Sequence, residues 1–572
     1  MTLPDSLAET SPSEIIFPDD PFDVRLALRS SGTLRAFNDA SVLTSADVHV
    51  AQRLAQLGNE TNQEVLLAVA LAVRGVRSGS VCVDLPQLRS QLALVDPSLP
   101  WPDPSSWLPA VAASSLVGQG KPLRLEYGLL YLDRYRRQEE QVRQDLLTRE
   151  AQPPPDVKIP ALTVGLGRLF PGEDAGQQRT AAEIAATQWT TVLGGGPGTG
   201  KTTTVARILA LLLGLADKPL RVAMAAPTGK AAARLQAAVQ TEAGTFAPGD
   251  RHQLPTLTAS TLHRLLGWVP GGGTRFKHNR DNRLPFDVVV VDETSMVSLT
   301  MMARLLEAVR PDARLILVGD PDQLASVEAG AVLADLVAGL TARAAAQAEQ
   351  EAVLGSTTSS PADQPAVSEK KSARTKEPAA GKGPARPAAA AGGVVLLRKT
   401  WRFDGSIAEL AAAVRDGDSD TAIDILRNAG DAVALVDHDH PGIRSDVVGA
   451  ASQVREAARA GDGTAALTRL ERHRLLCAHR TGPRGVQDWT RRIENWLVDE
   501  HDDFGEGEWY AGRPVLVMAN DYALGLFNGD TGVVVRDPDA ALRAVFVREG
   551  NLASYAPRRL GDVQTVHAMT VH

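Results

Sequence analysis

The chain has 572 residues, which is too long for a single hydrophobic core. Its composition, 44% hydrophobic and 22% charged, is ordinary for a globular protein. The formal net charge of -8 gives no overall signature of nucleic-acid binding, so any DNA contact must come from local surfaces. The two cysteines, Cys82 and Cys477, exclude a disulfide framework, a four-cysteine zinc site and an iron–sulfur cluster on this chain alone. With no secretory or membrane signal in the sequence, we expect a cytoplasmic protein without membrane partners.

Residues 1–155 predict a separate, mostly helical domain. An apolar helical stretch runs from Glu64 to Arg74, and a charged helix is expected from Asp133 to Glu150. Three consecutive prolines, residues 153–155, end this part of the chain. No residues here have the spacing of a catalytic site, so the expected role of this domain is packing or contact with a partner protein.

Residues 156–340 predict a domain built on a parallel sheet, because strands and helices alternate along this stretch. Such a sheet is covered by helices on both faces, and its strands are almost wholly apolar. The expected strands are Thr190–Leu193, Arg221–Ala226, Asp287–Val291 and Arg314–Val318.

A phosphate-binding loop follows the first of these strands and precedes an apolar helix. The pattern is Gly-x-x-x-x-Gly-Lys-Thr, in which backbone N–H groups surround the β-phosphate of a nucleoside triphosphate. Lys201 is placed to reach the β- and γ-phosphate oxygens, and the Thr202 hydroxyl is placed to bind Mg²⁺. The sequence therefore predicts an ATP site with Mg²⁺. The rest of the loop consists of Gly195, Gly196, Pro197, Gly198, Thr199 and Gly200.

An acidic pair follows the four valines of the third expected strand. Ligands bind at the carboxyl edge of a parallel sheet, so Asp292 is predicted to hold Mg²⁺ and Glu293 to act as general base for the attacking water. Taken alone, such a pair is more often a surface feature, but the phosphate loop upstream favours the catalytic interpretation. Gln323 follows the next strand, where its amide is suited to sense the γ-phosphate.

Two further loops at the same sheet edge carry candidate DNA ligands. Thr228, Lys230 and Thr261 offer hydroxyls and a cation that can follow a DNA backbone without reading bases. His263 is a fourth candidate, with a hydrogen-bonded structural histidine as the alternative. Trp401, Tyr510 and Phe527 are possible base-stacking rings, each with core or interdomain packing as the alternative.

The composition changes abruptly at residues 341–393, which are rich in Ala, Pro, Ser, Lys and Glu and contain no aromatic residue. Such a segment buries too little apolar surface to offset its ordering entropy, so we predict a flexible insertion. Residues 394–572 are predicted to form a second α/β domain.

Several ordered motifs resemble those of superfamily 1 DNA helicases, and in particular the RecD family, the alpha subunits of exodeoxyribonuclease V (RecBCD). The resemblance implies an α/β fold with tandem RecA-like P-loop NTPase domains after a mostly helical N-terminal domain. It also implies that Gln178 contacts adenine and that Arg402 reaches the γ-phosphate from across the cleft between the two domains. The motifs begin at Gly176, Ala226, Ser260, Leu324, Leu397, Leu475, Trp509 and Asn520.

The function implied by the resemblance is that of a 5′–3′ single-strand translocase. It would work with RecB-like and RecC-like subunits to unwind and degrade broken duplex DNA ends for recombinational repair. The sequence shows no nuclease site on this chain, so we expect the nuclease to lie in a partner.

The last residues, Val566–His572, resemble the start of a motif that the family continues with Lys-Ser-Gln-Gly. We therefore expect either a fragment of a longer chain or a motor that has lost a later motif. Two alternatives stay open: a subunit that binds ATP without hydrolysis and holds partners through residues 1–155, and a stand-alone RecD-like helicase.

Overall fold

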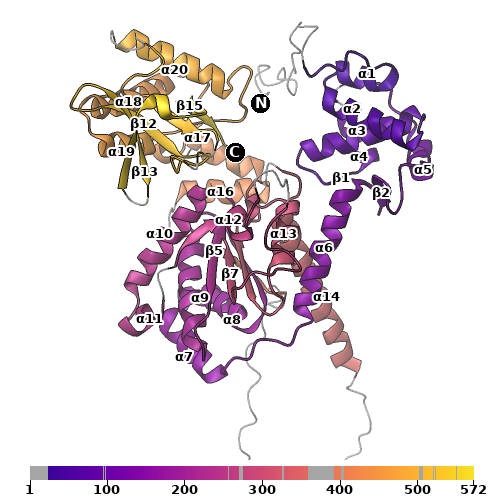
Figure 1. Cartoon of the computed structure of the whole chain (residues 1–572), viewed down its shortest axis with the longest axis horizontal. Coiled ribbons are helices and arrows are strands. Elements are labelled where there is room, and N and C mark those ends of the chain that lie inside the picture. Colours follow the sequence, from indigo (N-terminus) through magenta and orange to yellow (C-terminus); the bar gives the residue numbers. More distant parts are fainter. Residues whose placement is uncertain are drawn as a thin grey trace, which may run out of the picture.

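Figure 1 shows the computed structural model, in which a helical N-terminal domain, a central sheet domain and a C-terminal region follow one another along the chain. The α/β fold class predicted from the sequence is confirmed. None of the helices in the part of the chain described here is both long and apolar enough to cross a membrane. The structure describes residues 24–93, 96, 98–254, 257–269, 275–324, 328–357, 392–400, 405–428, 430–501, 507–519, 521, 523–548 and 551–571.

The N-terminal domain packs its helices around α3, which contains the predicted apolar stretch. Trp107 is buried against this helix, and its indole N–H donates to the Glu64 carbonyl at 2.9 Å. A small antiparallel sheet of order β1-β3-β2 closes the domain. Its elements are α1 (Gly32–Asp39), α2 (Ser45–Gly58), α3 (Gln63–Arg77), β1 (Cys82–Val83), α4 (Leu85–Ala93), α5 (Pro104–Ala113), β2 (Leu123–Glu126) and β3 (Leu129–Leu132).

The central domain is a six-stranded parallel sheet of order β6-β5-β7-β8-β4-β9. Alternate residues of each strand enter the cores on opposite faces, as Val290 and Val291 of β7 do. All four strands expected in residues 156–340 are present, as β4, β5, β7 and β8, whereas β6 was not predicted. The strands are β4 (Thr190–Gly195), β5 (Val222–Ala226), β6 (Ala259–Thr261), β7 (Val288–Val291), β8 (Arg314–Gly319) and β9 (Val394–Leu397).

Helices cover both faces of this sheet, as predicted. One group contributes to a core with Leu193 and Ile316, and the other to a core with Val192 and Leu317. The first group is α7 (Ile159–Leu169), α8 (Gly176–Thr187), α9 (Lys201–Leu215) and α10 (Gly229–Thr245), with α11 (Pro248–Gln253) beside α9. The second group is α6 (Asp133–Glu150), α12 (Leu262–Leu266), α13 (Leu299–Ala308) and α14 (Val332–Thr357).

Two boundaries predicted around the insertion are wrong. Strand β9 was assigned to the second domain, but it pairs in parallel with β4, placing Leu397 opposite Gly195. Four apolar residues predict a strand without indicating which sheet it joins, because strand pairing is set by long-range contacts. Helix α14 also continues to Thr357, so the first part of the predicted flexible insertion is helical. The remainder of that segment, residues 358–391, lies outside the described residues.

The C-terminal region combines one parallel strand pair with an antiparallel sheet. Strands β10 and β16 are parallel, whereas the order β14-β13-β12-β11-β15 is antiparallel throughout, which the prediction of parallel sheets did not anticipate. The helices are α16 (Ser406–Asp416), α17 (Ser419–Asn428), α18 (Pro441–Arg459), α19 (Gly463–Arg472) and α20 (Val486–Glu500). The strands are β10 (Leu475–Cys477), β11 (Pro514–Val517), β12 (Thr531–Arg536), β13 (Leu542–Arg548), β14 (Asn551–Tyr555), β15 (Val563–Thr565) and β16 (Ala568–Thr570).

A half-buried histidine is expected to make the stability of the C-terminal region depend on pH. His567 Nε2 lies 3.0 Å from the Tyr510 hydroxyl, and burial lowers the pKa of His567 to about 4, with the charge of Arg513 acting in the same direction. In the unfolded chain the His567 imidazole is therefore protonated below about pH 6.5, whereas in the folded region it is protonated only below about pH 4. We expect the free energy of unfolding to fall by up to roughly 3 kcal/mol as the pH drops through this window. Thermal unfolding at several pH values measures the slope, and His567→Gln is expected to flatten it.

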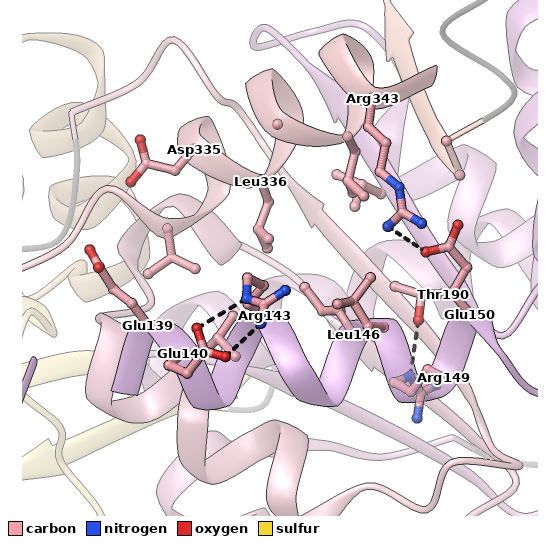
Figure 2. A pocket seen from close by; sticks show the side chains of 18 of the residues that line it. Glu139, Glu140, Arg143, Leu146, Arg149, Glu150, Thr190, Asp335, Leu336 and Arg343 are labelled. Carbon is pink, nitrogen blue, oxygen red and sulfur yellow. Dashed lines mark hydrogen bonds and ion pairs between the residues drawn. The ribbon is translucent and has the colours of Figure 1, made fainter. Parts of the chain in front are cut away.

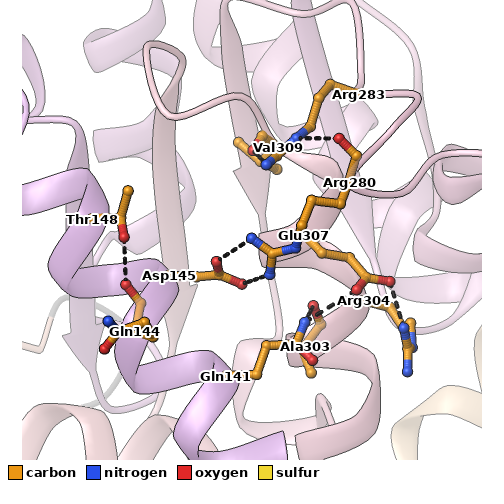
Figure 3. Close-up of polar contacts among 10 residues, drawn as sticks. All are labelled: Gln141, Gln144, Asp145, Thr148, Arg280, Arg283, Ala303, Arg304, Glu307 and Val309. Atoms are coloured by element: carbon orange, nitrogen blue, oxygen red, sulfur yellow. Dashed lines mark hydrogen bonds and ion pairs between the residues drawn. The ribbon is translucent and has the colours of Figure 1, made fainter.

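Helix α6 joins the N-terminal domain to the central sheet through polar contacts (Figure 3). Asp145 accepts two hydrogen bonds from the Arg280 guanidinium, at 2.9 and 2.8 Å. Gln141 donates to the Ala303 carbonyl and to Glu307, both at 3.1 Å. One helix of the N-terminal domain is thereby fastened to the loop before β7 and to α13.

The deepest of these contacts is made by Arg149, which is only 2% exposed. Its guanidinium donates to the Thr190 hydroxyl at 2.9 Å. It also donates to three backbone carbonyls, those of Trp189, Arg310 and Ala313, at 2.6 to 2.7 Å. These acceptors lie at or just before the first residues of β4 and β8. Arg149 therefore holds the amino ends of the two strands whose other ends carry the phosphate loop and Gln323.

We expect Arg149→Ala to lower the free energy of unfolding by roughly 3 kcal/mol, because three carbonyls, one in a buried and two in partly buried hydrogen bonds, lose a charged donor. Chemical denaturation followed by circular dichroism measures the change. Arg143→Ala is the matched control on the same helix, since Arg143 is exposed and pairs with Glu140. Equal loss of stability in the two variants would contradict the anchoring role of Arg149.

Candidate nucleotide and DNA site

The phosphate loop connects β4 to the first turn of α9. Gly200 caps α9 with φ +84°, a left-handed conformation that residues with a side chain rarely adopt. At Gly195 the backbone passes close to β9, so that a Cβ atom would lie 2.7 Å from the Leu397 carbonyl oxygen and 2.8 Å from the Thr199 hydroxyl. Glycine is therefore required by the shape of the turn at Gly195 and Gly200, and the unpaired N–H groups of the first turn of α9 are available to a phosphate.

Lys201 points back over the loop that precedes it. Its ammonium group donates to the carbonyls of Gly195 and Gly196, the latter at 2.9 Å. Burial lowers the pKa of Lys201, and the negative charges of Asp320 and Glu293 act in the opposite direction. The ammonium thus lies where the phosphates of a nucleotide are expected, close to acidic side chains from the neighbouring strands.

Asp292 and Glu293 leave the end of β7 in a sharp turn. Glu293 adopts φ +51°, and its backbone N–H donates to Asp292 Oδ1 at 2.9 Å. Burial raises the pKa of Asp292 to about 6, and the adjacent charge of Glu293 adds to this, while the Glu293 N–H and Lys201 oppose it. A carboxylate directly after β7 and a threonine hydroxyl in the first turn of α9 offer hard oxygens of the kind that Mg²⁺ prefers. Asp292 and Thr202 therefore suit the predicted metal role.

Gln323 follows β8 and is tied to the turn after β7. Its side-chain oxygen accepts a hydrogen bond from the Ser295 hydroxyl at 3.1 Å. A γ-phosphate sensor at this position would thus be linked to the acidic pair through Ser295. Sequence reasoning missed Asp320. This residue directly follows β8, is 8% exposed, and its negative charge raises the pKa of Lys201. Its position directly after a buried strand, like that of Asp292, was the available signal.

Gln178 and Arg402 were suggested only by the family resemblance, and the structure describes the first but not the second. Gln178 lies buried on α8, which packs against β4 and β9, while its neighbour Gln177 accepts a hydrogen bond from the backbone N–H of Arg398 at 2.9 Å. Arg402 lies outside the described residues. The strand that leads to it, β9, is the immediate neighbour of the phosphate-loop strand and not part of a second sheet.

The four DNA candidates lie at the carboxyl ends of β5 and β6, on the edge that also bears the phosphate loop. Thr228 caps α10 by accepting from the Ala231 N–H at 3.2 Å, and Thr261 caps α12 by accepting from the Arg264 N–H at 3.2 Å. Both hydroxyls therefore have a structural function. Lys230 is exposed, and the His263 ring packs 5.9 Å from the ring of Phe276, centroid to centroid.

Phe527 of the C-terminal region reaches this same loop. A Cβ atom on Gly229 would lie 3.0 Å from Cγ of Phe527, so the ring rests on the backbone between Thr228 and Lys230. The Arg548 guanidinium lies 5.2 Å from the ring centroid. This arrangement favours interdomain packing for Phe527, the alternative to a base-stacking ring. Tyr510, hydrogen-bonded to His567, also packs internally, and Trp401 lies outside the described residues.

Comparison with known proteins assigns the family. A family model described as "RecBCD enzyme subunit RecD, N-terminal domain" matches residues 39–131, and one described as "AAA domain" matches residues 178–329. A RecBCD enzyme subunit RecD from Mycolicibacterium smegmatis is 51% identical over 549 residues, or 94% of this chain and 87% of that protein. The chain belongs to the RecD family.

More distant RecD-family proteins extend the comparison. A RecBCD enzyme subunit RecD from Haemophilus influenzae is 31% identical over 73% of this chain and 67% of that protein. An ATP-dependent RecD2 DNA helicase from Deinococcus radiodurans is 31% identical over 67% of this chain and 41% of that protein. A solved structure of Bacteroides Pif1 bound to single-stranded DNA covers 70% of this chain and 82% of that one, with 13% identity and a TM-score of 0.31, too low to inform the site.

The predicted family and enzyme class are therefore confirmed. As a RecD-family protein the chain is an ATP-dependent DNA helicase of the RecBCD type. The individual roles given above to Lys201, Asp292, Glu293 and Gln323 remain predictions from geometry and chemistry.

Proposed function

We propose that this RecD-family chain is a 5′–3′ DNA translocase that works with RecB-like and RecC-like subunits at broken duplex ends. The observation that carries the motor function is the convergence of Lys201, Asp292, Glu293 and Asp320 at one edge of the sheet. The polarity and the partners are inferred from the RecD family, and the nuclease of such an assembly would belong to a partner subunit.

In this proposal the nucleotide site hydrolyses ATP by positioning and electrostatics. Lys201 leaves the carbonyls of Gly195 and Gly196 to contact the β- and γ-phosphates, and Glu293 accepts a proton from the attacking water. Thr202 and Asp292 would hold Mg²⁺, which would supply positive charge to the phosphate oxygens. Gln178 would contact the adenine, and Arg402 would contribute a further positive charge at the γ-phosphate.

Hydrolysis would be coupled to movement through the turn that links Asp292 to Gln323. The Ser295 hydroxyl bridges these two strand ends, so a change at the γ-phosphate alters the position of the neighbouring loops. Thr228, Lys230, Thr261 and His263 would hold the DNA backbone on the loops after β5 and β6. The Phe527–Gly229 contact would transmit the movement between the central sheet and the C-terminal region.

The test is unwinding of partial duplexes that carry either a 5′ or a 3′ single-stranded tail. We expect the chain, assembled with its RecB-like and RecC-like subunits, to unwind the 5′-tailed substrate when ATP and Mg²⁺ are present. The same assembly with Lys201→Gln is the control, since it removes only the contribution of this motor. Unwinding of 5′-tailed DNA that persists in the control would overturn the assignment, and failure to assemble with those subunits would favour a stand-alone helicase.

A further inference from the structure

A groove of about 1080 Å³ lies between α6 and α14, bordered by the N-terminal domain and by the start of β4. Figure 2 shows α6 along one wall and α14 along the other, with Leu146 and Leu336 facing each other across the middle. None of the predicted nucleotide or DNA residues lines this groove. It is therefore separate from the motor site described above.

Two acidic side chains of the groove have no ion-pair partner among the described residues, whereas its arginines are all engaged. Glu139 and Asp335 lie near each other at one end, on opposite walls, and neither forms an ion pair with a residue in the described ranges (Figure 2). Glu139 is half-buried, and burial raises the pKa of its carboxyl group while Arg136 acts in the opposite direction. The cations that line the groove are already paired: Arg136 with Glu126 at 2.7 Å, Arg143 with Glu140 at 2.6 Å and Arg343 with Glu150 at 2.8 Å, besides Arg149 with its four oxygen acceptors.

The shape of the groove suits a short helix. On α6 the lining residues run from Arg136 to Glu150. The fourteen residues from one to the other span about 21 Å of helix, or roughly four turns. Apolar side chains lie between these ends, with Leu146 on α6 and with Leu336 and Leu340 on α14, beside the arginines that already have partners. A cavity that is open, elongated and apolar in the middle matches the way amphipathic helices bind in grooves between two other helices.

We propose that this groove binds an amphipathic helix of a partner subunit, about four turns long, with an apolar stripe and a lysine or arginine that pairs with Glu139 and Asp335. The inference rests on the proposed assembly with RecB-like and RecC-like subunits and names the surface used for it. A cationic residue at one end would pair with the two carboxylates, and leucine-like side chains would cover the apolar walls. DNA is disfavoured as occupant, because the two unpaired groups are acidic and the arginines that line the groove already have ion-pair or hydrogen-bond partners.

The first experiment is assembly of the full chain with its RecB-like and RecC-like subunits, measured by co-purification and by titration. The double variant Glu139→Arg, Asp335→Arg places like charges opposite the proposed cation, and we expect its affinity for the partners to fall about tenfold or more. DNA-stimulated ATP hydrolysis by the isolated variant is expected to be unchanged, which shows that it is folded. Glu471→Arg, an exposed carboxylate on α19, is the matched control for the charge change.

The second experiment identifies the occupant directly. A photo-crosslinking benzoylphenylalanine in place of Leu336 is expected to label a partner subunit, at a peptide that carries both apolar and basic residues. A crosslink to residues 358–391 of the same chain, to DNA or to nothing would overturn the proposal.

The outcomes separate this inference from the proposed function. If the unsubstituted chain assembles and the double variant assembles equally well, the groove proposal fails and the proposed function stands. If the unsubstituted chain does not assemble with RecB-like and RecC-like subunits, both fail.

Discussion

Replacement of Lys201 by glutamine is expected to lower DNA-stimulated ATP hydrolysis on the order of a thousandfold. The ammonium lies at the opening of the phosphate loop, held by the carbonyls of Gly195 and Gly196, and it is the only residue of that loop with a full positive charge. Removing one preorganised charge from a phosphoryl-transfer site commonly costs two to three orders of magnitude in kcat, or roughly 3 to 4 kcal/mol. Steady-state phosphate release, with and without single-stranded DNA, measures the effect.

Lys218→Gln is the matched control for Lys201, because Lys218 is exposed in the turn after α9. We expect this variant to hydrolyse ATP at the unsubstituted rate, and Lys201→Gln to keep its melting temperature. Full hydrolysis by Lys201→Gln would contradict the phosphate-loop assignment. A chain that binds ATP but does not hydrolyse it, even unsubstituted and bound to DNA, would favour the alternative of a structural subunit.

Glu293→Gln is expected to separate nucleotide binding from hydrolysis. The side chain follows Asp292 in a left-handed turn at the end of β7, and its proposed role is to accept a proton from water, which an amide cannot do. We expect kcat to fall on the order of a thousandfold, while affinity for ATP changes little. Single-turnover hydrolysis and equilibrium binding of a fluorescent ATP analogue measure the two quantities separately.

The control for this variant is Glu471→Gln, which makes the same substitution on an exposed helix position. A parallel loss of ATP binding and hydrolysis in Glu293→Gln would show that the residue supports the fold of the turn. Unchanged hydrolysis would assign the general base elsewhere, with Asp320 as the next candidate because its carboxylate lies in the same cluster.

The parts of the fold that could be predicted are those with strong local signals. The buried strand of four valines, the glycine loop and the helix after it each impose their structure on a few consecutive residues, so β7 and the start of α9 were found. The position of β9 could not be predicted, because the same four apolar residues fit the edge of either sheet. The antiparallel sheet of the C-terminal region was missed for the same reason, since pairing direction depends on distant partners.

The site was predictable where a residue follows a strand directly. Asp292 and Gln323 were expected at the carboxyl edge of the sheet, and both follow strands that end there, but the hydrogen bond from Ser295 to Gln323 could not be foreseen. Thr228 and Thr261 were selected for their hydroxyls as DNA ligands, and the structure shows that both hydroxyls already cap helices. A capping role is compatible with DNA contact, because a hydroxyl that accepts from the backbone still has its proton to donate to a phosphate.

The hydrogen bonds of Arg149 near the first residues of β4 and β8 bear on how the domains would move. These contacts hold the strands at the edge of the sheet opposite the phosphate loop. If the proposed motor function holds, we expect ATP-driven rearrangement at their other ends, with the N-terminal domain and the central sheet moving as one body relative to the C-terminal region. A protein bound to the N-terminal domain would then keep its position relative to the central sheet. During each step of the motor, the C-terminal region would be displaced relative to that protein.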